Sequence, residues 1–145
     1  VPVSRRLWIE IKSGPGTVPA LVRTLARSRL APAQVSVIAF DFETVRLAKR
    51  LLPRLQVGWL QETEDGGATF PARAVVEQAR AAGLDALSLE ASLCDEAVFK
   101  YARGAELKLY AWTVDDPELA RWLVGREVDG ITTNRPGELR RELSF

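Results

Sequence analysis

Strand-like and helix-like segments alternate along this 145-residue chain, and the alternation restricts the possible folds more than any other feature. Runs rich in apolar residues are separated by segments whose apolar residues recur at helical spacing. The predicted strands cover 8–12, 35–40, 56–61, 84–90, 107–114 and 128–133, and the predicted helices cover 17–29, 41–52, 71–83, 95–103, a segment that begins at 117, and a short tail at 138–143. Successive strands joined by short crossovers require parallel pairing and right-handed connections. We therefore predict a single α/β domain over residues 1–145.

Two architectures fit this pattern, a doubly wound sheet and a (β/α) barrel. The turn Ser13-Gly14-Pro15-Gly16 has neither the GxGxxG spacing nor the Walker lysine that a nucleotide-binding doubly wound sheet usually carries. A complete TIM barrel has eight strands and roughly 250 residues. The expected fold is an incomplete TIM barrel of about six parallel strands that lacks the first two β/α units.

Residues that start and stop helices stand at the predicted boundaries. Asp41 is placed to cap the helix over 41–52, and Pro71 and Gly83 stand at the start and end of the helix over 71–83. The run 115–117, Asp-Asp-Pro, combines an N-cap with a proline in the first helical turn. These signals support the helix assignments independently of the apolar pattern.

The first predicted strand carries an acid and a base two residues apart, Glu10 and Lys12. Strand side chains alternate between faces, so these two share one face, whereas Leu7, Ile9 and Ile11 pack on the other. A charged face near the carboxyl end of a strand suits the site at the top of a β/α barrel. The alternative for this segment alone is a half-exposed antiparallel strand with a surface ion pair.

Composition excludes several classes of function. The net charge is +1 and the basic residues are scattered through helical segments, so no nucleic-acid partner is expected. Cys94, the single cysteine, excludes an internal disulfide and a thiolate zinc cluster, and we interpret it as a small residue at a helix start. The chain contains no histidine, so it cannot supply an imidazole acid, base or metal ligand. No apolar run is long enough to span a bilayer and no signal-peptide pattern opens the chain, so the cytoplasm is the default location.

Five segments together resemble glycerophosphodiester phosphodiesterases in order and spacing, over nearly the whole chain. They are Glu10-Ile11-Lys12, Val37-Ile38-Ala39-Phe40-Asp41, Val57-Gly58-Trp59-Leu60, the run from Lys108 to Asp115 (KLYAWTVD), and the run from Val128 to Pro136 (VDGITTNRP). The resemblance is to the C-terminal part of that family. It implies a TIM barrel that binds a divalent metal, Mg²⁺ or Ca²⁺, and hydrolyses small-molecule glycerophosphodiesters to glycerol 3-phosphate and an alcohol, in lipid and glycerol metabolism.

The resemblance also implies roles for individual residues. Glu10 matches a metal-ligand glutamate, Lys12 a lysine beside the phosphate, and Trp112 an aromatic residue that lines the glycerol pocket. These roles are chemically sensible, because carboxylates bind hard cations, an ammonium stabilises charge on a phosphoryl group, and an indole offers a flat apolar wall. Trp112 as an ordinary packing aromatic is the alternative. Glu90 shares the inward side of its strand with Ala86 and Ser88, and either faces the same cavity or lies at the surface.

The chain departs from the family in what it lacks. The family's catalytic histidine pair and its other carboxylate ligands lie in the two absent β/α units, so this chain alone is expected to be inactive and to bind no metal tightly. Ala39 and Asn134 stand where the family often has serine and aspartate. An open barrel is expected to form a homo-oligomer or to pair with its missing N-terminal part.

Three interpretations compete. The first is the C-terminal portion of a phosphodiesterase barrel whose histidines lie elsewhere. The second is a naturally short pseudoenzyme or assembly module of the same fold. The third is an aldolase-type barrel in which Lys12, desolvated by its apolar neighbours, forms a Schiff base, although Glu10 on the same face opposes this.

Overall fold

The computed structural model describes residues 2, 4–63 and 70–143, and most of the predicted polar loop over 62–69 lies outside them. Six parallel strands form one sheet in the order β1 to β6. The strands are β1 (Leu7–Glu10), β2 (Val35–Ala39), β3 (Gln56–Gln61), β4 (Ala86–Glu90), β5 (Lys108–Trp112) and β6 (Gly130–Ile131). The helices are α1 (Val18–Arg27), α2 (Phe42–Leu51), α3 (Ala72–Ala81), α4 (Glu96–Gly104), α5 (Pro117–Val124) and α6 (Pro136–Glu142), with 3-10 turns η1 (Pro15–Thr17), η2 (Pro32–Gln34) and η3 (Ala91–Leu93). The predicted incomplete barrel, with six parallel strands and alternating helices, is therefore confirmed, and we call it a half-barrel.

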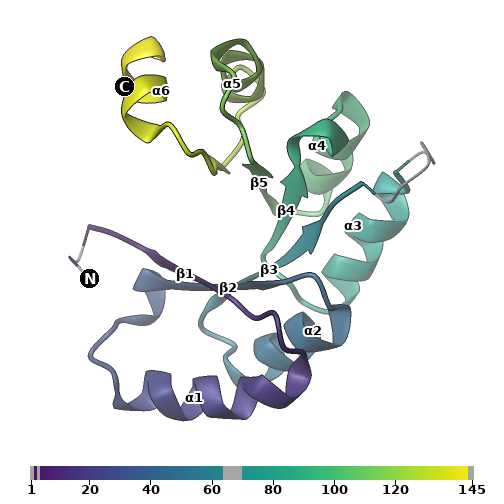
Figure 1. The fold of residues 1–145 in the computed structure, drawn as a ribbon. Coiled ribbons are helices and arrows are strands. Elements are labelled where there is room, and N and C mark those ends of the chain that lie inside the picture. The colour runs from purple at the N-terminus through teal and green to yellow at the C-terminus, as the bar shows by residue number, and fades with distance from the viewer. Residues whose placement is uncertain (1, 3, 64–69, 144–145) are drawn as a thin grey trace.

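The sheet is curled, and the helices form an arc around its convex side (Figure 1). The opposite side of the sheet, which we call the concave face, corresponds to the interior of a complete barrel. β1 and β6 are the outermost strands, and Figure 1 shows β1 and the C-terminal helix α6 on opposite sides of the opening. This arrangement leaves each of these two strands paired on one side only.

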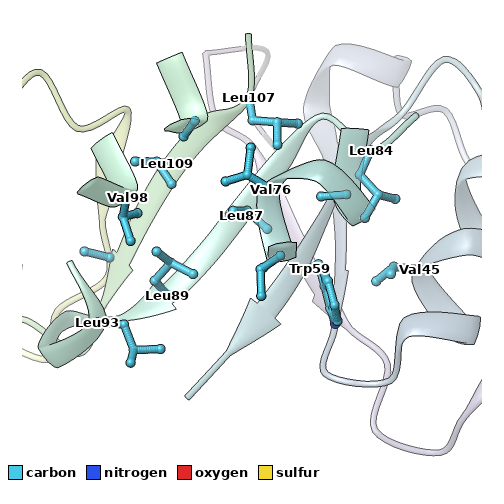
Figure 2. Packing of buried hydrophobic residues seen from close by; sticks show 14 of the residues in the cluster. Val45, Trp59, Val76, Leu84, Leu87, Leu89, Leu93, Val98, Leu107 and Leu109 are labelled. Carbon is cyan, nitrogen blue, oxygen red and sulfur yellow. The ribbon is translucent and has the colours of Figure 1, made fainter. Parts of the chain in front are cut away.

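The core lies between the sheet and the helices. Residues that pair in register share a face of the sheet, and one such row, Ala39, Trp59, Leu87 and Leu109, points toward the helices. Figure 2 shows Leu87 and Leu89 of β4 with Val45, Val76 and Val98 from three helices around the same layer. The apolar residues that set the helical and strand periodicity are thus the ones that the fold buries.

Aspartates cap α2, α4 and α5, and the sequence predicted the caps of α2 and α5. Asp41 accepts a hydrogen bond from Thr44 N at 2.8 Å and Asp95 accepts one from Val98 N at 2.8 Å. Asp116, followed by Pro117 at the first turn, accepts from the backbone N–H groups at the start of α5. Each aspartate satisfies amides that have no partner inside the helix.

The outermost strands are shorter than predicted. β1 ends at Glu10, so Lys12 lies beyond it, and β6 comprises two residues, not 128–133. Leu7 was predicted to pack on the core side, but it is 38% exposed. Each of these strands pairs with one neighbouring strand. A strand paired on a single side has fewer hydrogen bonds and side-chain contacts at its ends, so the regular strand is shorter.

Polar and aromatic residues cover the amino end of the concave face. Trp8 of β1 meets Tyr110 of β5 edge-on, with ring centroids 4.6 Å apart. Gln56 of β3 donates to the Tyr110 hydroxyl at 3.1 Å and accepts from Arg6 at 2.7 Å. Gly130 is needed here, because a Cβ at that position would lie 2.8 Å from the Tyr110 ring. These contacts link strands that are far apart in the sequence across the concave face.

No helix in the described part of the chain combines the length and the apolar character needed to cross a membrane.

Candidate functional site

The candidate site lies at the carboxyl ends of the strands, on the concave face. Parallel strands all end at the same edge of a sheet, and in β/α barrels this edge carries the active site. Glu10, Glu90 and Trp112 are the last residues of β1, β4 and β5. Lys12 follows β1 by two residues. The fold therefore brings all four predicted site residues to one edge, although it does not bring all of them into contact.

Glu10 and Lys12 form a loose ion pair. The distance from Lys12 Nζ to Glu10 Oε1 is 3.5 Å, and the side chains are 80% exposed for lysine and 32% exposed for glutamate. An ion pair this open to solvent contributes little to stability, about 0 to 1 kcal/mol. The ammonium group of Lys12 can therefore exchange its partner for an anionic ligand at low cost.

The exposure of Lys12 also removes the basis of the Schiff-base interpretation. That interpretation needs apolar neighbours to withdraw the amine from water. The lysine side chain is 80% exposed, and of the apolar residues proposed to cover it Ile11 points into the core. The predicted desolvation is wrong, because Lys12 lies beyond the end of the strand.

Two aromatic rings form a wall at this edge. The rings of Phe40 and Trp112 meet edge to face, with centroids 5.8 Å apart and planes at 88°. The Trp112 indole N–H donates to Ser88 O at 3.1 Å, which fixes the plane of its ring. Phe40 is 41% exposed, and its carbonyl oxygen accepts from Trp59 Nε1 at 2.8 Å. An exposed ring held in this way offers an apolar surface to a ligand.

Phe40 was not among the predicted site residues, although the sequence contained a signal for it. It is the aromatic residue directly after β2, at the same carboxyl edge as Trp112. Its partner lies three strands away, and that contact depends on the curl of the sheet.

Glu90 lies on the concave face at the end of β4, and Thr63 in the loop after β3 donates hydrogen bonds to it. Its position is level with Trp112 in the register of β4 and β5. Its carboxylate accepts from Thr63 Oγ1 at 2.6 Å and from Thr63 N at 2.8 Å. These hydrogen bonds, the hydroxyl one first, lower the pKa of Glu90 below its usual value. Glu90 is therefore ionised at neutral pH, so it is suited to carry negative charge and not to donate a proton.

A second carboxylate joins the loops after β5 and β6. Asp115 accepts from Thr133 Oγ1 at 2.8 Å, from Asn134 N at 2.8 Å and from Asn134 Nδ2 at 3.0 Å. Hydrogen bonds from the Asn134 side chain and backbone and from Thr133 hold the pKa of Asp115 below its usual range. Within the predicted capping run 115–117, Asp116 is the residue that caps α5. The side-chain amide of Asn134 can donate to Asp115. An ionised aspartate at this position, which is common in the family that the sequence resembles, could not donate from its side chain.

The described residues do not by themselves fit the divalent metal that the sequence resemblance implies. Glu10 offers one carboxylate, and within 4–63 and 70–143 no three histidine, cysteine or acidic side chains gather closely enough to hold an ion. Mg²⁺ and Ca²⁺ usually require several oxygen ligands. The role of Glu10 as a metal ligand stays a prediction.

Cys94 lies between η3 and α4, as predicted for a residue at a helix start. It is half-buried, and burial raises the pKa of its thiol to about 11. The thiol is therefore protonated at neutral pH and does not act as a nucleophile.

Comparisons with known proteins bear on the family and the fold of the chain. The model of the Glycerophosphoryl diester phosphodiesterase family matches residues 11–138. No curated protein is significantly similar to the chain in sequence.

Three solved structures show the similarity in fold. A putative glycerophosphoryl diester phosphodiesterase from Silicibacter pomeroyi superposes with a TM-score of 0.80 at 24% identity, over 95% of this chain and 50% of that one. A putative glycerophosphodiester phosphodiesterase from Galdieria sulphuraria gives 0.80 at 22% identity, over 97% and 57%. A phosphodiesterase from Oleispira antarctica, solved with the product sn-glycerol-3-phosphate, gives 0.78 at 20% identity, over 97% and 56%. The chain thus spans about half the length of these structures.

Proposed function

We propose that this chain, which belongs to the glycerophosphoryl diester phosphodiesterase family, forms the phosphate- and glycerol-binding half of an enzyme that hydrolyses glycerophosphodiesters to glycerol 3-phosphate and an alcohol. One observation carries the proposal. A solvent-exposed lysine and an ordered aromatic wall, Lys12 and the Phe40–Trp112 pair, lie at the same carboxyl edge of a half-barrel. The solved phosphodiesterase with bound sn-glycerol-3-phosphate, which has the same fold, supports this choice of ligand.

Each group has a part that follows from its chemistry. A phosphodiester is an anion, and negative charge accumulates on its oxygens as the phosphorus is attacked. The ammonium group of Lys12 stabilises that charge. The indole of Trp112, oriented by Ser88, packs against the carbon side of the glycerol group. Glu90, held ionised by Thr63, cannot act as the acid that protonates the leaving alcohol.

We propose that the acid and the base of the reaction come from outside these 145 residues. The chain has no histidine, and general acid and base groups each contribute roughly two to four powers of ten in rate. We therefore propose that the isolated chain is inactive and that Glu10 completes a metal site only together with ligands from another segment. The chain supplies binding and electrostatic stabilisation of the substrate.

Ligand binding by the chain itself tests the proposal. Titration with glycerol 3-phosphate, followed by NMR chemical shifts of the tryptophan indole N–H groups, should perturb Trp112. Lys12→Met should weaken this binding about 10-fold, because a charge-assisted contact to phosphate is lost. Lys100→Met, at an exposed position on α4, is the matched control and should bind as the wild type does. Equal binding by the Lys12→Met and Lys100→Met variants would remove Lys12 from the site.

A complete barrel that includes the catalytic histidines tests the reaction. In that protein Lys12→Met should reduce turnover of glycerophosphocholine by roughly two to three powers of ten without unfolding it. Glu10→Gln should abolish metal-dependent hydrolysis, since the amide keeps the shape but not the charge. If Lys12→Met has no effect and Glu10→Gln only lowers stability, the two residues form a structural ion pair and the assignment is wrong.

A further inference from the structure

The near-zero net charge of the chain hides an uneven distribution. Residues 1–61 contain half of the 20 basic residues but only three of the 19 acidic ones. No Asp or Glu occurs within 11–40 or within 44–61. A charge asymmetry of this kind indicates a surface that meets an anionic partner.

An apolar cavity lies in this basic half of the chain. Its volume is about 370 Å³, and it is formed by the end of α1, the loop that leads to β2, and the link from α2 to β3. The lining residues are Val22, Leu25, Ala26, Ser28, Leu30, Ala31, Pro32, Val35, Leu51, Leu52, Pro53, Arg54 and Leu55. Leu51, on its margin, is 42% exposed. The cavity therefore presents aliphatic groups directly to solvent.

Four arginines line this cavity or directly adjoin its lining residues in the chain, and we call Arg23, Arg27, Arg29 and Arg54 the arginine rim. Arg54 is itself a lining residue. On α1, Arg23 and Arg27 directly follow the lining residues Val22 and Ala26, so they form one stripe beside the cavity. Arg29 stands between the lining residues Ser28 and Leu30.

The charges of the arginine rim are not neutralised within the described part of the molecule. All four side chains belong to exposed residues. None of them takes part in an ion pair among residues 4–63 and 70–143, where the ion-paired arginines are Arg46, Arg73, Arg103, Arg121, Arg126 and Arg135. The rim therefore keeps its positive charge for an external partner.

The cavity and the candidate site lie at opposite ends of the sheet. Val35 is the first residue of β2 and Leu55 directly precedes β3, so the cavity lies at the amino ends of the strands. In Figure 1 the end of α1 and the loop to β2 lie on the left, beside the start of β2. An object bound at this end leaves the carboxyl ends of the strands open to solvent.

We propose that the arginine rim and its apolar cavity dock this chain on the surface of an anionic phospholipid bilayer. Guanidinium groups bind lipid phosphates, and clusters of basic residues are attracted to anionic membrane surfaces. Exposed Leu51 and the aliphatic cavity lining then contact the acyl region just below the headgroups. A nucleic acid would match the charge but would give this apolar surface no partner. The proposal does not rest on the proposed enzymatic function.

Vesicle co-sedimentation of the 145-residue chain tests the proposal. Vesicles of phosphatidylcholine alone are compared with vesicles in which a third of the lipid is phosphatidylglycerol, at about 0.1 M salt. Binding should occur to the anionic vesicles and decrease steeply as salt is raised. The double variant Arg27→Gln, Arg54→Gln should bind about 30-fold more weakly, since each arginine near an anionic surface changes the partition about fivefold.

A matched control separates the arginine rim from overall charge. Arg80→Gln combined with Arg141→Gln removes the same charge from exposed positions on α3 and α6. This control should bind as the wild type does. An equal loss of binding in both double variants would overturn the proposal, because it would mean that the net charge of the chain alone determines its binding to the vesicles.

The apolar part of the surface has its own test. Leu51→Gln should weaken binding several-fold, whereas Tyr101→Gln, at an equally exposed site on α4, should not. Circular dichroism checks that every variant is folded. Binding to neutral vesicles as strong as to anionic ones, no binding to anionic vesicles, or tighter binding to a DNA duplex than to them would refute the proposal.

Discussion

Lys49 is the residue whose removal should most clearly weaken the fold at the amino ends of the strands. Its Nζ lies 2.8 and 2.7 Å from the two carboxylate oxygens of Asp85 and also donates to Pro53 O at 3.2 Å and Leu55 O at 3.3 Å. The Asp85 carboxylate accepts from Val57 N at 2.7 Å as well. One ion pair therefore connects α2, the loop before β3, and the start of β4.

The substitution Lys49→Met keeps an unbranched apolar side chain of nearly the same length but removes the ammonium group. Hydrogen bonds to charged groups contribute about 1.5–3 kcal/mol each in favourable sites. Here the side chains are 17% and 36% exposed, so solvent screens part of the interaction. We expect a loss of about 2 kcal/mol in the free energy of unfolding, or about 6 °C in Tm.

Urea unfolding followed by circular dichroism measures this loss. Lys100→Met, on the exposed surface of α4, is the control and should change the free energy of unfolding by less than about 0.5 kcal/mol. A double-mutant cycle with Asp85→Asn should give a coupling of about 1 kcal/mol or more. If Lys49→Met unfolds like the control, or if the two substitutions are additive, the ion pair does not hold these elements together.

Four further outcomes are expected. Isothermal titration of the chain should show no Mg²⁺ or Ca²⁺ binding tighter than about millimolar, because Glu10 alone is an incomplete site; tight binding would reveal an unrecognised one. Cys94 should react with a thiol reagent far faster in urea than when folded, since burial raises its pKa to about 11. The lowered pKa of Asp115 gives stability that is present above its unfolded pKa and lost as pH falls through the folded value, so Asp115→Asn should flatten the decrease of Tm below about pH 4. The single-sided edges of β1 and β6 should make the chain associate, and sedimentation as a stable monomer at low concentration would contradict this.

The sequence by itself determined the elements and their order. The strand predicted over 56–61 is β3 as found, and Asp41 and Asp116 cap α2 and α5 at helix starts that the sequence predicted. These signals are local, because a cap or an alternating pattern acts on residues a few positions away. Local rules also placed Glu90 at the end of a strand and Glu10 and Trp112 two residues before such an end, and parallel pairing gathers these positions at one edge.

Local rules failed where a residue's surroundings depend on distant parts of the chain. They extended β1 to Lys12 and β6 to 128–133. Local patterns do not show whether a strand lies at the margin of the sheet, where it has one neighbouring strand and not two. They also did not predict that Asp115, next to the cap of α5, accepts hydrogen bonds from Thr133 and Asn134 across the loops.

Only the tertiary structure decided which side chains meet. The contacts of Trp8 with Tyr110 and of Phe40 with Trp112 join residues about a hundred and about seventy positions apart. The arginine rim likewise combines α1, the loop after it, and the link before β3. Sequence periodicity indicates which face of a strand or helix a residue occupies. The curl of the sheet and the packing of the helices on it set the distances between side chains of different elements. Those distances determine which groups can bind a ligand together.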